Sequence, residues 1–208
     1  MNEPESIHPW STIWRDPRGT IRTIVEVNPK HSFYLLAAAG GLGNALNYVS
    51  SFGLGATMEL GEIIAMCILI GPLSGFLSVY MWSWLLGVAT RFLGGIATSV
   101  ELRAAVAWSW APVVYLLPLW GVKYIMFRDE LFRLEKPYME SHALLSGMNG
   151  FFGLVDFLVA IVSLFILFNA VAEVAALSIW KSIGAFAAVM LALSIPAFLL
   201  LQAVVPMP

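Results

Sequence analysis

Asp156 is the residue whose position in this sequence most directly suggests chemistry. It is the only charged residue in the apolar run Ala143–Ala172. A carboxylate inside a membrane is costly and usually faces protein or a water-filled cavity, where it can hold a proton or a cation. Together with Asn44, Asn47 and Ser163, Asp156 could line a polar path. The alternative interpretation is that these residues belong to packing seams between helices, where small and polar side chains let helices approach closely.

A second candidate is the stretch GGIATSVELRAAVAWSWAP, residues 94–112, which places Glu101 and Arg103 directly before a tryptophan-rich apolar run. Ser99 is expected to cap a helix here, with Glu101 in its first turn near the positive end of the helix dipole. Arg103 can extend to the lipid headgroups. A membrane boundary therefore explains both charges, but it does not explain the pair Gly94 and Gly95 or the final Pro112.

Motifs for catalysis and metal binding are missing from the sequence. The three histidines, His8, His31 and His142, lie far apart and outside the apolar runs, and there is a single cysteine, Cys67. The patterns HExxH, GxxxxGK[ST] and GxSxG do not occur. We therefore predict that the protein is not an enzyme and that it has no metal and no cofactor.

The composition is that of a membrane protein. Hydrophobic residues make up 60% of the 208 positions and charged residues only 12%, whereas soluble domains have about 45–50% and about 25%. The charge is too sparse to cover a surface that faces water, so the lipid bilayer is the expected surrounding. A net charge of −2 gives no basic surface for nucleic acid.

Five apolar runs predict five membrane-spanning helices, because about 20 apolar residues cross the hydrocarbon core as a helix. The predicted fold class is therefore all-α, a polytopic membrane helical bundle. Residues 1–31 form a cytoplasmic N-terminal head with an interfacial helix near residues 20–27, and residues 32–208 form the transmembrane domain. The predicted spans are about 33–52, 63–90, 102–122, 146–171 and 182–205. In the second span, Gly71 and Gly75 form a GxxxG pair, which is typical of close helix packing.

The distribution of Lys and Arg favours a cytoplasmic N-terminus and a C-terminus outside. This orientation places seven basic residues inside: Arg15, Arg18, Arg22, Lys30, Arg91, Arg103 and Lys181. It places four outside, all in one connection: Lys123, Arg128, Arg133 and Lys136.

The motif FLGGIATSVELRAAVAWSWAPVV resembles the Yip family (Ypt-interacting proteins) in its bacterial form, through a Gly-Gly turn, an acidic-Leu pair and an Ala-rich helix that ends in Ser-x-x-Pro. The segment AVAEVAALSIWKSIGAFAAVML, with Glu173, Trp180 and Lys181, is similar to the beginning of the family's last span. The N-terminal DPRGTIRTIVE also fits. The matching residues of the first motif are Gly94, Gly95, Glu101, Leu102, Ala107, Ser109 and Pro112.

The resemblance implies five helices, a cytoplasmic N-terminus and a C-terminus across the membrane. Eukaryotic relatives look like adaptors in vesicle traffic that bind Rab-type GTPases and each other. Their N-terminal region is longer than the 31 residues here, which puts GTPase binding by this chain in doubt. If the third and fifth spans begin side by side, Glu101 could pair with Lys181, and Arg103 with Glu173.

These observations favour a non-catalytic organiser or adaptor of the cell inner membrane. It would act through helix packing with itself or with other membrane proteins, and its motif and interaction residues would be Gly94, Gly95, Glu101, Arg103, Pro112, Glu173 and Lys181. The alternative is a channel or transporter with a polar path around Asp156. A third hypothesis is lipid handling by Trp10, Trp14 and the arginines, which ordinary interfacial anchoring explains equally well.

Overall fold

The computed structural model describes residues 8–204, with side chains up to residue 196, and all regular structure in these residues is helical. The all-α prediction is therefore confirmed. In chain order the helices are α1 (Pro9–Thr12), α2 (Pro17–Val27), α3 (Phe33–Ser51), the 3₁₀ helix η1 (Leu54–Ala56), α4 (Leu60–Phe92), α5 (Ser99–Ser109), α6 (Ala111–Tyr115), α7 (Leu117–Phe127), the 3₁₀ helix η2 (Arg128–Phe132), α8 (Pro137–Ser141), α9 (Ala143–Val174) and α10 (Ile179–Val204).

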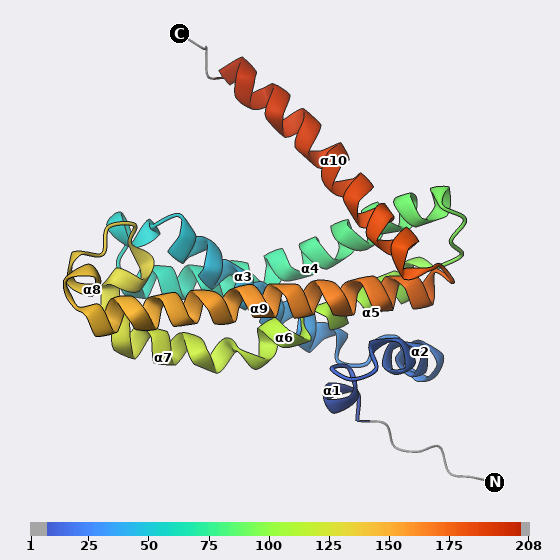
Figure 1. Cartoon of the computed structure of the whole chain (residues 1–208), viewed down its shortest axis with the longest axis horizontal. Helices are drawn as coiled ribbons and strands as arrows, with labels where there is room; N and C mark the ends of the chain where they lie inside the picture. Colours follow the sequence, from blue (N-terminus) through green and yellow to red (C-terminus); the bar gives the residue numbers. More distant parts are fainter. Residues whose placement is uncertain (1–7, 205–208) are drawn as a thin grey trace.

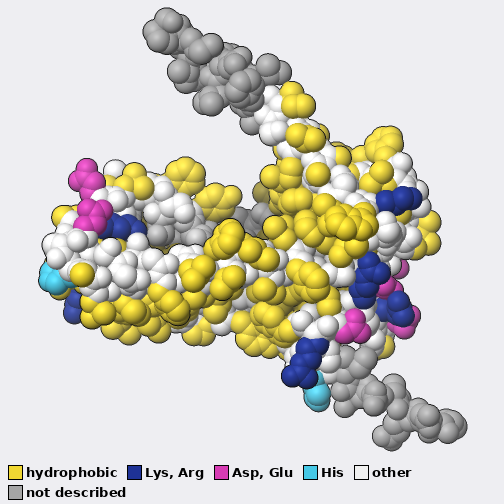
Figure 2. Space-filling view, in the orientation of Figure 1, with side chains coloured by type: hydrophobic (Ala, Val, Ile, Leu, Met, Phe, Trp, Pro, Cys, Tyr) yellow, Lys and Arg dark blue, Asp and Glu magenta, His cyan; other side chains and the backbone are white. Residues whose placement is uncertain are grey.

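Four helical stretches of the described chain are long and apolar enough to cross a membrane: Leu60–Phe92, Ser99–Phe132, Ala143–Val174 and Ile179–Pro196. Figure 2 shows apolar side chains over the middle of the molecule, while the charged side chains gather toward its two ends. The chain is therefore a membrane protein. The count of five spans is not confirmed, because the 19-residue α3 is not among the four. Its glycines, asparagines and serines lower its hydropathy.

Two prolines divide the predicted third span into three consecutive helices. Pro112 lies in the first turn of α6 and Pro118 in the first turn of α7, and the breaks occur at Trp110 and Leu116. Each break lies two residues before a proline, since proline offers no N–H and its ring clashes with the preceding turn. The predicted range 102–122 is therefore one segmented path that begins at Ser99 and continues to Phe127.

α3 and α4 are packed with their backbones in close contact. A Cβ atom added to Gly75 would lie 2.8 Å from the Cα of Gly41 and still closer to the carbonyl oxygen of Ala37. A Cβ on Gly71 would lie 2.9 Å from the Cα of Leu42. The GxxxG pair of α4 therefore faces α3, as its spacing predicts for close helix packing.

The bundle has two distinct ends (Figure 1). The head end carries α1 and α2 together with the α4–α5 and α9–α10 turns, residues 93–98 and 175–178. The far end carries η1, η2 and α8, residues 52–59 and 128–142. α10 packs on α4 and α9 near its start, where Ser182, Ala185 and Val189 are buried, and then diverges from the other helices.

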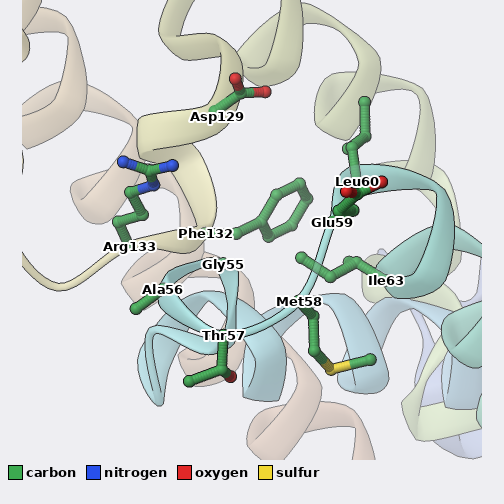
Figure 3. A pocket seen from close by; sticks show the side chains of 10 residues that line it. All are labelled: Gly55, Ala56, Thr57, Met58, Glu59, Leu60, Ile63, Asp129, Phe132 and Arg133. Carbon is green, nitrogen blue, oxygen red and sulfur yellow. The ribbon is translucent and has the colours of Figure 1, made fainter.

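The far end encloses a cavity of about 430 Å³, in which Phe132 of η2 lies between η1 and the start of α4 (Figure 3). Glu59, Asp129 and Arg133 bring charge to this cavity. The hydroxyl of Ser50, at the end of α3, donates a hydrogen bond of 2.7 Å to the carbonyl of Leu131. None of the predicted motif, interaction or polar-path residues lines this cavity.

Candidate interaction site

Gly94 and Gly95 form the C-terminal cap of α4. Gly94 has a φ of +87°, and its N–H donates to the carbonyl of Arg91 at 3.0 Å, while the N–H of Gly95 donates to the carbonyl of Thr90 at 2.8 Å. This pair of bonds is a Schellman motif, in which glycine is favoured at the left-handed position. A Cβ on Gly95 would lie 3.2 Å from the Cβ of Ala175, so the turn lies tightly against the end of α9.

The α9–α10 turn repeats the same motif beside it. The N–H groups of Ala176 and Leu177 donate to the carbonyls of Glu173 and Ala172, and Ala176 has a φ of +52°. The N–H of Ile96 donates to the carbonyl of Ala175 at 3.2 Å and therefore joins the two turns. The ammonium of Lys181 donates to the carbonyl of Leu93 at 3.3 Å. The turns that lead into the third and fifth predicted spans thus lie side by side.

Glu101 caps its own helix and does not pair with Lys181, so that predicted pairing is wrong. Its carboxylate accepts a hydrogen bond of 2.7 Å from the N–H of Thr98, and its N–H donates to the hydroxyl of Thr98. These reciprocal bonds are a capping box. The N-cap is Thr98 rather than Ser99, which is the first residue of α5.

Arg103 and Glu173 also have other partners than predicted. The guanidinium of Arg103 lies over the ring of Tyr80 in α4, with 4.8 Å from Cζ to the ring centroid. Glu173 binds Arg22 of α2: Nε of Arg22 donates to Oε1 of Glu173 at 2.6 Å. The pairing of Arg103 with Glu173 is therefore wrong, because the head lies on the end of α9 and Arg22 occupies this carboxylate.

The head helix α2 packs on the last turns of α9 and is held there by two polar contacts that are one helical turn apart in each helix. Nε of Arg18 donates to Oδ1 of Asn169 at 3.2 Å, and Arg22 binds Glu173. Glu173 lies at the C-terminal end of α9, where the helix dipole disfavours an acidic side chain. The cation of Arg22 offsets this cost and ties residues that are 151 positions apart.

The ionic contact keeps Arg22 charged. The hydrogen bond to Glu173, followed by the charge of Glu173, raises the pKa of Arg22 above its ordinary value. A raised pKa of a basic group adds stability below its ordinary pKa, and this contribution is lost only as the pH rises through the raised value. Changes near neutral pH therefore do not remove the charge of Arg22 from the docked head.

The apolar face of α2 is buried against protein. Thr20, Ile21 and Ile24 are at most 3% exposed, and α2 packs on α5 and α9. A helix with charged and apolar faces at this position was expected to lie at the lipid interface. The structure instead turns its apolar face toward the bundle, which leaves its charged face outward.

Aromatic side chains fix the first residues of the head. Trp10 lies 5.2 Å from the ring centroid of Trp108 and 5.6 Å from that of Tyr115, and Trp14 lies 5.3 Å from Tyr115. The hydroxyl of Tyr115 donates to the carbonyl of Trp10 at 3.1 Å. Pro112 is buried at the start of α6, between Trp108 and Tyr115 in the chain. The helix break at Pro112 thus lies beside the docking position of the head.

The four residues of the predicted polar path do not line one common cavity, although the cavities at Asn44 and at Ser163 share Trp82 and Trp110 as lining residues. Asn44 and Asn47 line a cavity of about 1050 Å³ between α3 and α4. Asp156 forms an ion pair with Lys123 of α7, with 2.6 Å from Nζ to Oδ2. Ser163 lines another cavity, of about 170 Å³, and its buried hydroxyl has no hydrogen-bond partner among the described residues.

Lys123 lies elsewhere than the sequence predicted. It was assigned to an outer connection, yet its side chain is only 5% exposed and lies within α7. Its ammonium is 4.6 Å from the ring centroid of Trp120. The signal in the sequence was the absence of any break between Leu117 and Phe127, which favours continuation of the helix past Val122. Asp156, whose side chain is 37% exposed, is thus paired with a buried cation.

Arg18, Arg22 and Asn169 were not chosen from the sequence as a set. Arg18 and Arg22 share one face of α2, and Asn169 and Glu173 share one face of α9, because residues four apart are neighbours on a helix. This spacing was a usable signal for each helix alone. In the part of the chain that the structure describes, no group of three His, Cys, Asp or Glu residues is arranged to hold a metal ion.

Comparison with known proteins gives one family. The family model described as the Yip1 domain matches residues 10–201, which covers almost the whole chain and includes the head, both turns and α10. No curated protein and no solved structure matches the chain. The resemblance drawn from the Gly-Gly turn and the start of the last span is confirmed.

Proposed function

The chain belongs to the Yip1 domain family, and from this premise we propose that it is a non-catalytic membrane organiser or adaptor. Its partners would be other membrane proteins or further copies of itself. It would act in the cell inner membrane through a surface formed jointly by the docked head and the two turns at the head end. The residues of this surface belong to α2, to the α4–α5 turn and to the beginning of α10.

The observation that carries this proposal is the docking of the head on the end of α9. Two polar contacts and a buried apolar face connect α2 to residues about 150 positions later. Because α2 is docked, it forms one surface of fixed arrangement together with the α4–α5 turn and the beginning of α10. Apolar side chains remain exposed on it, including Val27 at 80%, Ile96 at 78% and Trp180 at 79%. Exposed apolar groups with a charged surround are typical of interaction surfaces.

The proposed topology has five spans, with the head in the cytoplasm and the C-terminus outside. α3 supports it, because α3 begins near Arg103 at the head end and ends at Ser50, which bonds to Leu131 at the far end. Its 19 residues correspond to about 28 Å, close to the thickness of the hydrocarbon core. Because Lys123 is buried, it no longer counts among the basic residues outside. Seven basic residues then lie on the cytoplasmic side and three on the outer side, and this larger excess supports the proposed orientation.

A channel or transporter is the weaker proposal. Such a protein needs a continuous polar route, whereas Asp156 is paired and Asn44 and Asn47 line a different cavity.

We expect release of the head to abolish partner binding. A photo-crosslinking amino acid at Val27 would report on partners in intact membranes, in the wild type and in the variants Arg22→Glu and Ile21→Asp. Arg22→Glu places a second carboxylate against that of Glu173, so the two groups repel each other. Ile21→Asp places a carboxylate in a fully buried apolar site. We expect Ile21→Asp to lower the cross-linked product by about tenfold or more, and Arg22→Glu to lower it less.

The charge swap Arg22→Glu with Glu173→Arg is the matched control, because it restores an attractive pair and should restore the product. Hydrogen exchange of residues 17–27 shows whether α2 is released in each variant. The proposal fails if the same product forms from Val27 after hydrogen exchange has shown that α2 is free. It also fails if a crosslinker at Leu134, exposed at the far end, captures the same partner equally well.

A further inference from the structure

A small cavity at the head end is lined by two cations and two phenols. It has a volume of about 150 Å³ and lies between the residues before α3, the middle of α4 and the first turn of α5. Lys30, Tyr34, Tyr80 and Arg103 line it, together with Pro29, Phe33 and Val100. The motif residue Arg103 therefore belongs to a site of its own, apart from the contact of the head with α9.

The charge of this cavity is unbalanced. No carboxylate is among its lining residues, and neither Lys30 nor Arg103 forms an ion pair within the described part of the chain. The guanidinium plane of Arg103 is held over the ring of Tyr80, at 4.8 Å. A cation on an aromatic face keeps its N–H groups free for an anion. Glu101, the nearest acidic residue along α5, is engaged in its capping box.

The position of the cavity corresponds to the level of the lipid headgroups. Lys30 comes three residues before α3 begins, and Arg103 lies in the first two turns of α5, where another predicted span begins. Tyr34 and Tyr80 are 64% and 48% exposed. Tyrosine, lysine and arginine concentrate at this level of a membrane, where one end of the side chain is apolar and the other is wet.

An exposed apolar strip leads from the cavity along α4. Tyr80, Leu77 and Leu73 follow at helical spacing on one face, and the two leucines are 71% and 69% exposed. A ligand bound between the cations could therefore lay a hydrocarbon chain along this face. A soluble anion has no hydrocarbon chain and would not contact this apolar strip.

We propose that this cavity binds the phosphate headgroup of an anionic phospholipid. Lys30 and Arg103 bind the phosphate oxygens, a tyrosine hydroxyl donates a further hydrogen bond, and an acyl chain lies along Leu77 and Leu73. The site goes beyond the proposed adaptor function and does not depend on it, since partner binding at α2 and lipid binding here use different residues.

Native mass spectrometry of the full chain in a neutral detergent would test the site by titration with three probes: phosphatidylglycerol, phosphatidylcholine and inorganic phosphate. We expect phosphatidylglycerol to bind the wild type about tenfold more tightly than phosphatidylcholine, and each of Lys30→Gln and Arg103→Gln to weaken it by about tenfold. Arg91→Gln is the matched control, because Arg91 is an exposed cation at the head end outside the cavity.

The proposal is overturned if the variant that combines Lys30→Gln with Arg103→Gln binds phosphatidylglycerol within about twofold of the wild type. It is also overturned if Arg91→Gln weakens phosphatidylglycerol binding as much as Lys30→Gln or Arg103→Gln does. Competition by inorganic phosphate at the same concentration as the lipid would also overturn it, because the site would then recognise a free anion. Size-exclusion chromatography checks the fold of each variant. Lys30→Gln decides the outcome if Arg103→Gln does not fold, since Lys30 is exposed and its hydrogen bonds to described residues come from its backbone alone.

Discussion

Replacement of Lys123 by methionine is expected to destabilise the protein by about 2–3 kcal/mol, below the range for a fully buried pair because the side chain of Asp156 is 37% exposed. Methionine fills similar space but leaves the carboxylate of Asp156 without its cation, 2.6 Å away in the native protein. The side chain of Lys123 is only 5% exposed, so its replacement leaves no cation at this point of the contact between α7 and α9. The measurement is the free energy of unfolding in mixed micelles, followed by tryptophan fluorescence.

The double variant Lys123→Met with Asp156→Leu separates the charge from the packing. It removes both ions, so most of the stability should return, as replacement of a buried ion pair by apolar groups is often neutral. Lys136→Met is the control, because Lys136 lies at the start of α8 and forms no ion pair with a described residue. If Lys123→Met and Lys136→Met lowered the free energy of unfolding equally, the ion pair between Lys123 and Asp156 would not contribute to stability.

Replacement of Gly75 by alanine should destabilise the α3–α4 contact by about 3 kcal/mol, the upper part of the range for overpacked sites. The added Cβ would meet the backbone of Gly41 and Ala37, which cannot rotate away as a side chain could. The two helices would therefore have to separate along their contact. Thermal unfolding of the purified variant, followed by circular dichroism, measures the loss.

Gly153→Ala is the control for this substitution. Gly153 lies in the middle of α9, and a Cβ there would meet nothing within 4 Å. Alanine is the better helix former by about 1 kcal/mol, so Gly153→Ala should leave the stability unchanged or raise it. If Gly75→Ala were as stable as Gly153→Ala, the close approach of α3 and α4 could not be what holds them together.

Much of the fold follows from local features of the sequence. The apolar runs, of which the one at α9 contains the single charge of Asp156, predict the helices at α3, α4, α5–α7, α9 and α10, because a helix is the default for a chain in lipid. The Gly94–Gly95 pair predicts a turn, since only glycine adopts the left-handed cap without strain. Pro112 marks the helix break that the structure has at Trp110. Each of these depends on residues close together in the chain.

The candidate site was harder to predict, because its contacts join distant segments. Glu101, Arg103, Glu173 and Lys181 were chosen from the motif, but their partners are Thr98, Tyr80, Arg22 and a backbone carbonyl. Opposite charges near two adjacent turns suggested direct pairing. The position of α2 on α9 changed this, since it brought a third segment to Glu173, and no local pattern reveals such docking.

Asp156 is a second residue whose partner lies in a distant segment and could not be predicted from local sequence. An isolated carboxylate in an apolar run suggested a path for ions, with helix packing as the alternative, and Lys123 was counted separately as an outer charge. The structure continues α7 past Val122 and brings Lys123 against α9. The packing of α7 on α9 thus gave this carboxylate a cation as its partner.

The central claim is a five-span protein whose head lies on the same side of the membrane as the α4–α5 and α9–α10 turns. Accessibility of single cysteines to a membrane-impermeant maleimide tests it most directly. The background is Cys67→Ser, which removes the single, buried cysteine, and the two probes are Val27→Cys and Leu134→Cys. In intact spheroplasts we predict labelling of Leu134→Cys alone, with Val27→Cys labelled only after permeabilisation. Labelling of both from the same side would mean that α3 does not cross the membrane, and would contradict this account.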